Sequence, residues 1–273
     1  MKKDTTIKIG VIGVGHLGHF HLKQLKGIPN VSISGLYDSN PKRADEMSLL
    51  HNVHSYSSLD EILDKSDAVS IVTPTSKHYS VADKALNEDC NIFIEKPITD
   101  NMDHAELLLN KAKKLKKIIQ VGHIERFNPA FNLLKNTNIQ PRFIETHRLA
   151  EFNPRGNDVP VILDLMIHDL DIILSLIKSE IKNIHANGVK IVSPTVDIAN
   201  ARIEFNNGCV ANLTASRISQ KSMRKMRLFQ EKDYITIDFQ EGILEEYKVY
   251  DKPPITGKGD KVVKLDGKEK KYI

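Results

Sequence analysis

IGVIGVGHLGHFH, residues 9–21, places three glycines between a short apolar run and a segment with helical periodicity. Gly13, Gly15 and Gly18 have the spacing G-x-G-x-x-G. In this pattern the first glycine allows a tight turn, the second lets the backbone approach a pyrophosphate, and the third lets helix and strand pack closely. A helix N-terminus then offers N–H groups and a partial positive charge to phosphates. The stretch predicts a dinucleotide-binding turn, with an ordinary glycine-rich turn as the alternative.

The first part of the chain, residues 1–121, alternates short apolar runs with helical patterns. We expect strands at residues 7–12, 31–37, 68–72, 92–94 and 118–121, and helices at 17–25, 41–50, 80–86 and 102–116. This alternation is typical of βαβ units with right-handed crossovers. It predicts a doubly wound parallel sheet with helices on both faces, and therefore a dinucleotide-binding domain over residues 1–121.

The second part of the chain, residues 122–273, has a different pattern, dominated by strands. We expect a long apolar helix at residues 161–177 and strands at 143–152, 181–192, 198–205, 209–216, 225–230, 234–239 and 243–250. Asn207-Gly208 predicts a type I′ hairpin turn, which needs positive φ at both central positions. Residues 122–273 are therefore predicted to form an α+β domain with a large open, mostly antiparallel sheet.

Asp38 ends the predicted second strand, twenty residues after Gly18. A carboxylate at this place accepts hydrogen bonds from the adenosine ribose, and its charge repels a 2′-phosphate. We therefore expect NAD as the cofactor. Lys42 and Arg43 follow closely and can moderate the repulsion, so NADP stays open as an alternative.

Charge and composition narrow the classes of partner. The 39 Lys and Arg residues are nearly balanced by 35 Asp and Glu residues, and the signs alternate along most of the chain, which argues against a nucleic-acid surface. Residues 252–273 hold seven lysines and are interpreted as a solvated tail. Cys90 and Cys209 suggest no disulfide framework. No apolar run approaches the roughly 18 residues of a membrane span. We expect a cytoplasmic protein without nucleic-acid or membrane partners.

Glu95-Lys96-Pro97 follows the predicted strand at residues 92–94. The carboxyl edge of a parallel sheet is where such folds bind ligands. A lysine held there beside a nicotinamide can hydrogen-bond a substrate hydroxyl and help to move its proton. The alternative is a surface lysine before a proline that starts a helix.

Asp164 and His168 lie four residues apart in the predicted helix at residues 161–177. They would share one helix face, so that the carboxylate orients or charge-stabilises the imidazole. The pair is a candidate general base for a sugar hydroxyl. A metal pair is a rival interpretation, but the sequence has neither HExxH nor a cysteine cluster, and we expect no metal. A satisfied core histidine is the other alternative.

Gly13-Val14-Gly15-His16-Leu17-Gly18, Glu95-Lys96-Pro97, and Asp164 with His168 occur in an order and spacing that resemble the Gfo/Idh/MocA oxidoreductases. The resemblance runs from about residue 8 to about residue 250. It implies a Rossmann domain, a second domain with an open sheet, and hydride transfer between a nicotinamide and a sugar or polyol carbon. It places Lys96 next to the reacting carbon and Asp164 and His168 in the substrate pocket. Whether His168 or Lys96 takes the proton is left open.

The resemblance also implies a set of cofactor contacts. Thr73-Pro74 and His78 match the family's loop after the third strand, which passes near the cofactor. The full expected set is Gly13, Gly15, His16, Leu17, Gly18, Asp38, Thr73, Pro74, His78, Glu95 and Lys96. Asp89 stands where the family usually has a glycine, and aspartate tolerates left-handed backbone better than most residues. The open sheet implies a homodimer or homotetramer. The family pattern also continues with a helix beyond the stretch matched here.

A narrower similarity lies in VGHIERFNP, residues 121–129. It resembles bacterial UDP-N-acetylglucosamine 3-dehydrogenases, which supply 3-amino sugars for lipid A and so serve lipopolysaccharide biosynthesis. We expect substrate contacts from Arg126, Asn128, Arg148 and Arg155, with the arginines receiving a diphosphate. The expected reaction is oxidation of UDP-GlcNAc at C3 to the 3-keto sugar. A polyol or unactivated-sugar dehydrogenase of the inositol or glucose type, and a non-catalytic nucleotide-sensing regulator, are the alternatives.

Overall fold

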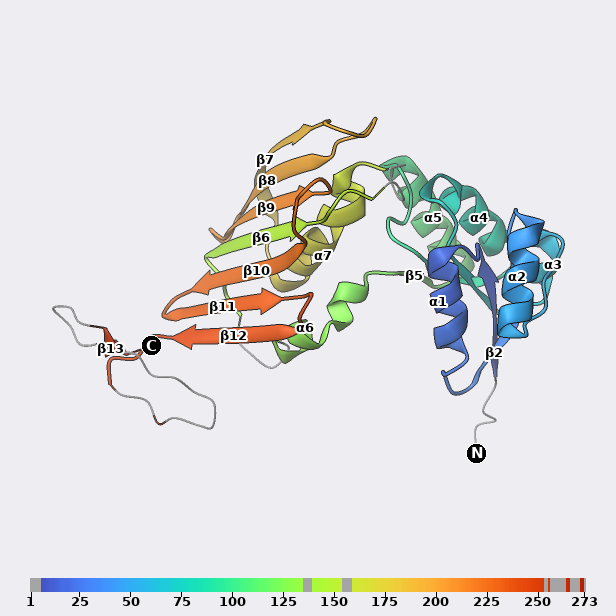
Figure 1. The fold of residues 1–273 in the computed structure, drawn as a ribbon, viewed down its shortest axis with the longest axis horizontal. Coiled ribbons are helices and arrows are strands. Elements are labelled where there is room, and N and C mark those ends of the chain that lie inside the picture. The colour runs from blue at the N-terminus through green and yellow to red at the C-terminus, as the bar shows by residue number, and fades with distance from the viewer. Residues whose placement is uncertain are drawn as a thin grey trace. The chain divides into compact units, whose positions relative to one another are not determined.

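The structure is a computed structural model that describes residues 6–134, 139–153, 159–252, 255, 264–265 and 271–272. Its contacts divide the chain into two compact units, Met1–His123 and Ile124–Ile273 (Figure 1). Each unit has its own sheet and its own hydrophobic core. The two are therefore described separately.

The first unit is a parallel sheet covered by helices, as predicted. Within the described residues it has five strands in the order β2-β1-β3-β4-β5, and every neighbouring pair is parallel. The strands are β1 (Ile7–Ile12), β2 (Val31–Tyr37), β3 (Ala68–Ile71), β4 (Asn91–Ile94) and β5 (Ile119–Val121). The helices are α1 (His16–Leu25), α2 (Pro41–His51), α3 (Leu59–Asp64), α4 (Thr75–Asn87) and α5 (Met102–Leu115). This order confirms the doubly wound sheet.

Helices pack on both faces of this sheet because neighbouring strand residues point to opposite sides. Val11 belongs to a buried cluster with residues of α1 and α2. Ile12 belongs to another buried cluster, with residues of α3, α4 and α5. The continuous apolar strands are thus explained by burial on both faces.

Two local signals explain where the helices differ from the prediction: one helix was not predicted, and another begins earlier than predicted. Helix α3 was not expected, although Ser58 and Glu61 have capping-box spacing, and the Ser58 side chain indeed accepts a hydrogen bond from the Glu61 N–H. Helix α4 begins at Thr75, five residues before the predicted start, directly after Pro74. Asp89 has φ +62°, so the left-handed turn expected before β4 is confirmed. Its carboxylate lies 2.7 Å from the Lys117 ammonium.

The second unit is built on a sheet that has seven strands within the described residues, in the order β12-β11-β10-β6-β9-β8-β7. Among the described strands of this sheet, β6 and β9 form the only parallel pair. The strands are β6 (Phe143–Leu149), β7 (Ile181–Val189), β8 (Ile198–Phe205), β9 (Val210–Ser216), β10 (Met223–Gln230), β11 (Asp233–Asp238) and β12 (Ile243–Lys248). The mostly antiparallel open sheet is confirmed. Two further short strands, β13 (Lys264–Leu265) and β14 (Lys271–Tyr272), pair with each other.

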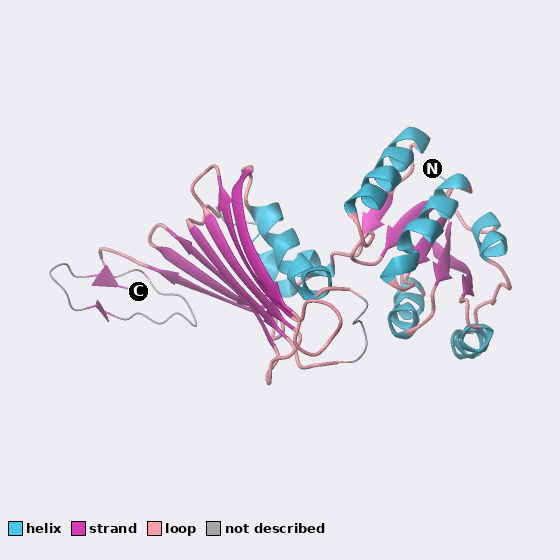
Figure 2. Cartoon of the chain, turned by 90° about the horizontal axis from the view of Figure 1, so that it is seen from above, coloured by secondary structure: helices cyan, strands magenta, loops and turns pink. Residues whose placement is uncertain are grey.

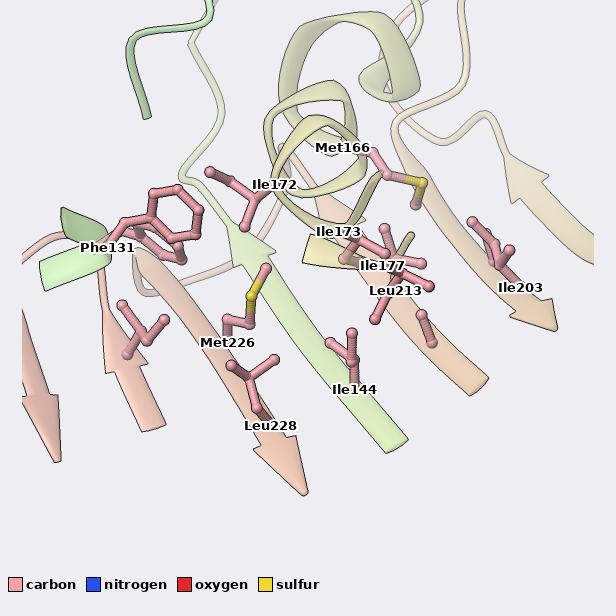
Figure 3. Close-up of a cluster of buried hydrophobic side chains, with 14 of the residues drawn as sticks. Phe131, Ile144, Met166, Ile172, Ile173, Ile177, Ile203, Leu213, Met226 and Leu228 are labelled. Carbon is pink, nitrogen blue, oxygen red and sulfur yellow. The ribbon is translucent and has the colours of Figure 1, made fainter. Parts of the chain in front are cut away.

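The helical segments of the second unit lie against one face of its sheet (Figure 2). They are the 3₁₀ turn η1 (Ile124–Phe127), α6 (Pro129–Leu133), the π-helix η3 (Ile162–Met166) and α7 (Ile167–Leu176). Ile172 and Ile173 of α7 point toward Ile144 of β6 and Leu213 of β9 (Figure 3). This cluster fixes α7, which carries the candidate residue His168, on the sheet.

The hairpin between β8 and β9 differs from the predicted type I′ turn. Among its loop residues only Gly208 has positive φ, at +84°, whereas type I′ also requires it at Asn207. The Gly208 N–H donates to Phe205 O at 3.0 Å and the Phe205 N–H to Cys209 O at 2.9 Å, which closes a three-residue loop. The Asn207 side chain instead accepts the Cys209 N–H at 3.0 Å. The prediction of a hairpin was right and its turn type was wrong.

Candidate active site

Each of the three glycines after β1 lacks a side chain for a different structural reason. Gly13 has φ +86°, and a Cβ there would lie 2.7 Å from Val72 O on the neighbouring strand end. A Cβ on Gly18 would overlap the carbonyl oxygen of Gly13. A Cβ on Gly15 would meet nothing within 4 Å. The turn therefore needs Gly13 and Gly18 for its own packing, whereas the bare backbone of Gly15 leaves space that a ligand can fill.

Helix α1 begins directly at this turn, with Gly15 as its N-cap and no side-chain cap. The first-turn N–H groups of a helix have no intrahelical acceptor, and they attract anions together with the helix dipole. His16 and Leu17, in that first turn, are exposed. The turn thus fits a pyrophosphate, as the glycine spacing predicts.

Asp38 lies beside the same turn. Its carboxylate accepts the Val14 N–H at 2.8 Å and the Asn40 N–H at 2.9 Å. The Arg43 guanidinium also reaches the turn, where Nε donates to Val14 O at 2.9 Å and Nη1 pairs with Glu46 at 3.2 Å. Both the negative charge expected to select NAD and the positive charge expected to moderate it therefore lie at the glycine turn.

Glu95, Lys96 and Pro97 follow the carboxyl end of β4, and the Lys96 side chain is half-buried. The Glu95 carboxylate binds His21 Nε2 at 3.0 Å and accepts the Lys96 backbone N–H at 3.2 Å. Burial by itself raises the pKa of Glu95, but the hydrogen bond and charge of His21, together with Lys96, outweigh it and lower the pKa. Glu95 is therefore an anion whose oxygens are held within the first unit.

His78 connects the two loops that were expected near the cofactor. Its ring is 1% exposed, with Nδ1 2.8 Å from Pro97 O and Nε2 3.0 Å from Thr73 O. The expectation of a direct cofactor contact from this side chain is wrong, because the buried ring bridges two backbone carbonyls. Pro74 ends the loop as the residue before α4. His78 instead fixes the Thr73 loop against the Lys96 segment.

In the second unit, Asp164 lies in the π-helix η3 and His168 in the first turn of α7. Both side chains are half-buried. The predicted helix is therefore present, but its first turns are wider than α-helical. Single π turns inside helices are frequent at functional sites. This irregularity is an independent reason to keep the pair as a candidate.

Arg148 does not have the substrate contact expected from the sequence. It is 2% exposed, and it donates to Asp169 Oδ1 from Nη2 at 2.8 Å and to Glu125 Oε1 from Nη1 at 2.9 Å. Burial lowers the pKa of Arg148, but the charges of Asp169 and Glu125 outweigh it and raise the pKa. The expectation was wrong because a buried guanidinium held by two carboxylates has no surface to offer a diphosphate.

The other expected substrate residues differ from one another. Arg126 forms a bidentate pair with Asp171, at 2.7 Å from Nε and 2.6 Å from Nη2, and its side chain is 50% exposed. Asn128 is the N-cap of α6: its Oδ1 accepts the Ala130 N–H, and its Nδ2 donates to Phe239 O. These bonds give it a capping role, for which the Asn-Pro order before a helix was a signal, and its substrate contact stays a prediction. Arg155 lies outside the described residues.

Residues missed by the sequence reasoning are the partners of these groups. Glu125 and Asp169 are buried acids that hold Arg148, and His21 holds Glu95. Glu125 and Asp169 lie inside stretches already singled out, but only the fold shows their partners. Across the residues that the structure describes, no group of three or more His, Cys, Asp or Glu side chains could hold a metal ion. None of the described helices is long and apolar enough to cross a membrane.

Comparison with known proteins extends this picture over both units. Residues 7–123 match the family model described as "Oxidoreductase family, NAD-binding Rossmann fold", and residues 135–244 match that of the "GFO/IDH/MocA C-terminal domain". The chain is 41% identical to the UDP-N-acetylglucosamine 3-dehydrogenase of Acidithiobacillus ferrooxidans, over 88% of this chain and 77% of that protein. A solved structure of that enzyme superposes with a TM-score of 0.84, covering 89% of this chain and 80% of the other.

A second relative is the NAD⁺-dependent scyllo-inositol 2-dehydrogenase of Bacillus subtilis, 29% identical over 78% of this chain and 68% of that protein. The two relatives are named for different substrates, a nucleotide sugar and a polyol. Since the family models cover both units and a 41% identical relative spans most of the chain, the chain belongs to the Gfo/Idh/MocA family and is an NAD-dependent oxidoreductase.

Proposed function

We propose that this chain oxidises the C3 hydroxyl of UDP-N-acetylglucosamine to a ketone with NAD⁺ as the acceptor. The observation that carries the proposal is the 41% identity to a UDP-N-acetylglucosamine 3-dehydrogenase over 88% of the chain. Bound NAD⁺ supplies the hydride acceptor. The sugar loses a hydride from C3 and a proton from the hydroxyl oxygen, so the products are the 3-keto sugar, NADH and a proton.

The residues of the first unit bind the cofactor and orient the hydroxyl. The first turn of α1 holds the pyrophosphate, and Asp38 accepts hydrogen bonds from the adenosine ribose. Lys96 donates a hydrogen bond to the reacting hydroxyl and stabilises negative charge on its oxygen. The half-buried position of Lys96 after β4 supports this role.

The residues of the second unit accept the proton and bind the rest of the sugar. His168 takes the hydroxyl proton, and Asp164 orients the imidazole. Lys96 is the alternative base. The two assignments differ in pH dependence: loss of kcat below the pKa of an imidazole, removed by His168→Gln, supports His168, and an unchanged profile in that variant supports Lys96. Arg126 is half-exposed, and we keep it as a proposed contact of the diphosphate. The substrate contact of Arg155 also stays a prediction.

The substrate is tested by NADH formation with a panel of sugars. UDP-GlcNAc, UDP-glucose, free GlcNAc, glucose and scyllo-inositol are each supplied with NAD⁺ or NADP⁺. UDP-GlcNAc with NAD⁺ is expected to have the highest kcat/KM, and mass spectrometry of the product is expected to show loss of two hydrogens. Activity with inositol alone would reject the nucleotide sugar and favour the second candidate, for which the 29% identical scyllo-inositol relative speaks.

We also propose a pathway for the product and an oligomeric state for the protein. The 3-keto product is a substrate for an aminotransferase, which would give a 3-amino sugar for lipid A in lipopolysaccharide biosynthesis in the cytoplasm. A homodimer or homotetramer would form through the open sheet of the second unit. A ladder of aromatic side chains, Phe143, Phe229, Tyr234 and Tyr247, supports this, because Phe229 and Tyr247 are 36% and 41% exposed. Light scattering after size-exclusion chromatography tests it, and a monomer at all concentrations contradicts it.

A further inference from the structure

A side chain of helix α1, His21, contacts the segment Glu95–Pro97 that contains Lys96. His21 is not part of either sequence motif. His21 Nε2 lies 3.0 Å from Glu95 Oε1, and His21 Nδ1 lies 2.8 Å from the Ser70 hydroxyl on β3. The side chains of His21 and Glu95 are only 17% and 13% exposed. The imidazole also packs edge-on against Phe93, with ring centroids 5.6 Å apart. A histidine from the helix after the glycine turn is therefore held by hydrogen bonds beside Glu95, the residue before the proposed catalytic lysine.

The hydrogen-bond chemistry of this contact has a defined direction. A carboxylate only accepts, so His21 Nε2 must carry the proton that it shares with Glu95. In the neutral imidazole Nδ1 is then the acceptor, and the Ser70 hydroxyl donates to it. Protonation of the imidazole keeps the Nε2–H bond to Glu95 and turns the Ser70 oxygen into an acceptor. The bond from His21 to Glu95 is therefore present in both states of the ring.

The second oxygen of Glu95 transmits this anchor to Lys96. Glu95 Oε2 accepts the Lys96 backbone N–H at 3.2 Å. Gly122 also lies so close to Glu95 that a Cβ there would be 3.1 Å from both carboxylate oxygens. The carboxylate is thus confined between His21, the Lys96 amide and the Gly122 backbone. Its position determines where the Lys96 side chain leaves the main chain.

We infer that His21 is a positioning residue for Lys96, acting through Glu95. The inference rests on the proposed function in that it takes Lys96 as the group that meets the substrate hydroxyl. The ammonium of a lysine is carried on a flexible four-carbon stem. The direction of the Cα–Cβ bond therefore decides which positions the ammonium can reach. His21 fixes that direction from α1, the helix whose N-terminus is proposed to hold the pyrophosphate. The cofactor-binding helix and the catalytic lysine are therefore linked by one continuous set of hydrogen bonds.

The test compares three variants of the full chain. His21→Leu removes both ring hydrogen bonds, whereas His21→Gln keeps an N–H that can donate to Glu95. His19→Leu is the matched control, because His19 lies on the same helix and its ring bonds His51 at 2.9 Å, away from Glu95. We expect His21→Leu to lower kcat about tenfold or more, as misplacement of a reacting group does. KM for NAD⁺ should stay within about twofold, since binding is not the step affected. His21→Gln should recover most of the rate, and His19→Leu should match the parent.

A second readout needs no sugar. Acetic anhydride labelling of Lys96, measured by mass spectrometry against Lys113, an exposed lysine on α5, as the internal standard, is expected to rise in His21→Leu and not in His19→Leu. If His21→Leu does not fold, Glu95→Gln replaces it, with the same expected losses. Unchanged kcat and labelling in His21→Leu, or a loss of kcat matched by an equal loss of NADH affinity, overturns the inference. If the parent oxidises no sugar of the panel, the proposed function fails, and the labelling comparison alone decides the role of His21.

Discussion

The guanidinium of Arg148 on β6 and the carboxylate of Asp169 on α7 form a buried ion pair, with Nη2 2.8 Å and Nε 3.1 Å from Oδ1. Each side chain is 3% exposed. Glu125 of η1 adds a second carboxylate, 2.9 Å from Nη1. One cation thus ties the 3₁₀ turn that begins the second unit and the helix that carries His168 to the same central strand.

Removing this cation should be costly. Arg148→Met leaves two carboxylates buried without their partner, and such a loss costs about 3–5 kcal/mol of unfolding free energy. Arg126→Met is the matched control, because its pair with Asp171 has a half-exposed arginine and should contribute about 0–1 kcal/mol. Urea unfolding of both variants measures the difference. Equal losses in the two would contradict the assignment of Arg148 to the core.

The contrast between these arginines shows what the sequence could and could not predict. The strands and helices of the first unit follow local patterns, and the spacing of Gly13, Gly15 and Gly18 identified the turn correctly. Arg148 was mistaken for a substrate residue because its acids, Glu125 and Asp169, are 23 and 21 residues away in sequence. Burial depends on such long-range contacts, which alternation and spacing do not contain.

The same limit hid His21, whose partner Glu95 is 74 residues away. The capping role of Asn128 was missed for a different reason, because the Asn-Pro signal for a helix start was present in the sequence and only a functional interpretation was given. The π-helix at Asp164 has no sequence pattern that distinguishes it from an α-helix start. Helix caps and turns could thus be predicted from local sequence signals, whereas contacts between residues distant in sequence could be identified only from the structure.

Gly15, the N-cap of α1, and Gly18, in its first turn, should respond differently to substitution by alanine. Gly15 has φ −64° and open space at its Cβ position, so Gly15→Ala should fold with a melting temperature close to the parent. Its methyl group would fill the space proposed for the pyrophosphate and weaken NADH binding about tenfold or more, roughly 1.4 kcal/mol. Gly18→Ala should lower the melting temperature, because its Cβ overlaps Gly13 O. Fluorescence titration and thermal unfolding separate the two effects, and unchanged NADH affinity in Gly15→Ala would argue against the cofactor site.

Acid should destabilise the first unit through His51. Burial, followed by the charge of Lys26 and the nearby His19, holds the pKa of His51 below its ordinary value. The unfolded chain therefore binds a proton here more readily than the folded one. The contribution of neutral His51 to the free energy of unfolding is fully present above the ordinary imidazole pKa of about 6.5. It is lost as pH falls toward the lower pKa that His51 has in the folded chain.

Thermal unfolding between about pH 7.5 and about pH 5.5 checks this sign. The melting temperature of the parent should fall across the interval, and His51→Gln should fall less. His185→Gln, which changes an exposed histidine on β7, should follow the parent. A slope for His51→Gln as steep as that of the parent would show that His51 does not carry the effect.

Selection of NAD over NADP should depend on the charge of Asp38. Its carboxylate lies on the glycine turn, 2.8 Å from the Val14 N–H, where an adenosine 2′-phosphate would bring a second negative charge. Two like charges a few ångströms apart near a protein surface repel by about 1–4 kcal/mol, so Asp38→Ser should raise the NADP-to-NAD ratio of kcat/KM at least about tenfold. Arg43, which already reaches Val14 O, then has a phosphate to pair with. Asp45→Ser, an exposed change on α2, is the control, and an unchanged ratio in Asp38→Ser would remove Asp38 from cofactor selection.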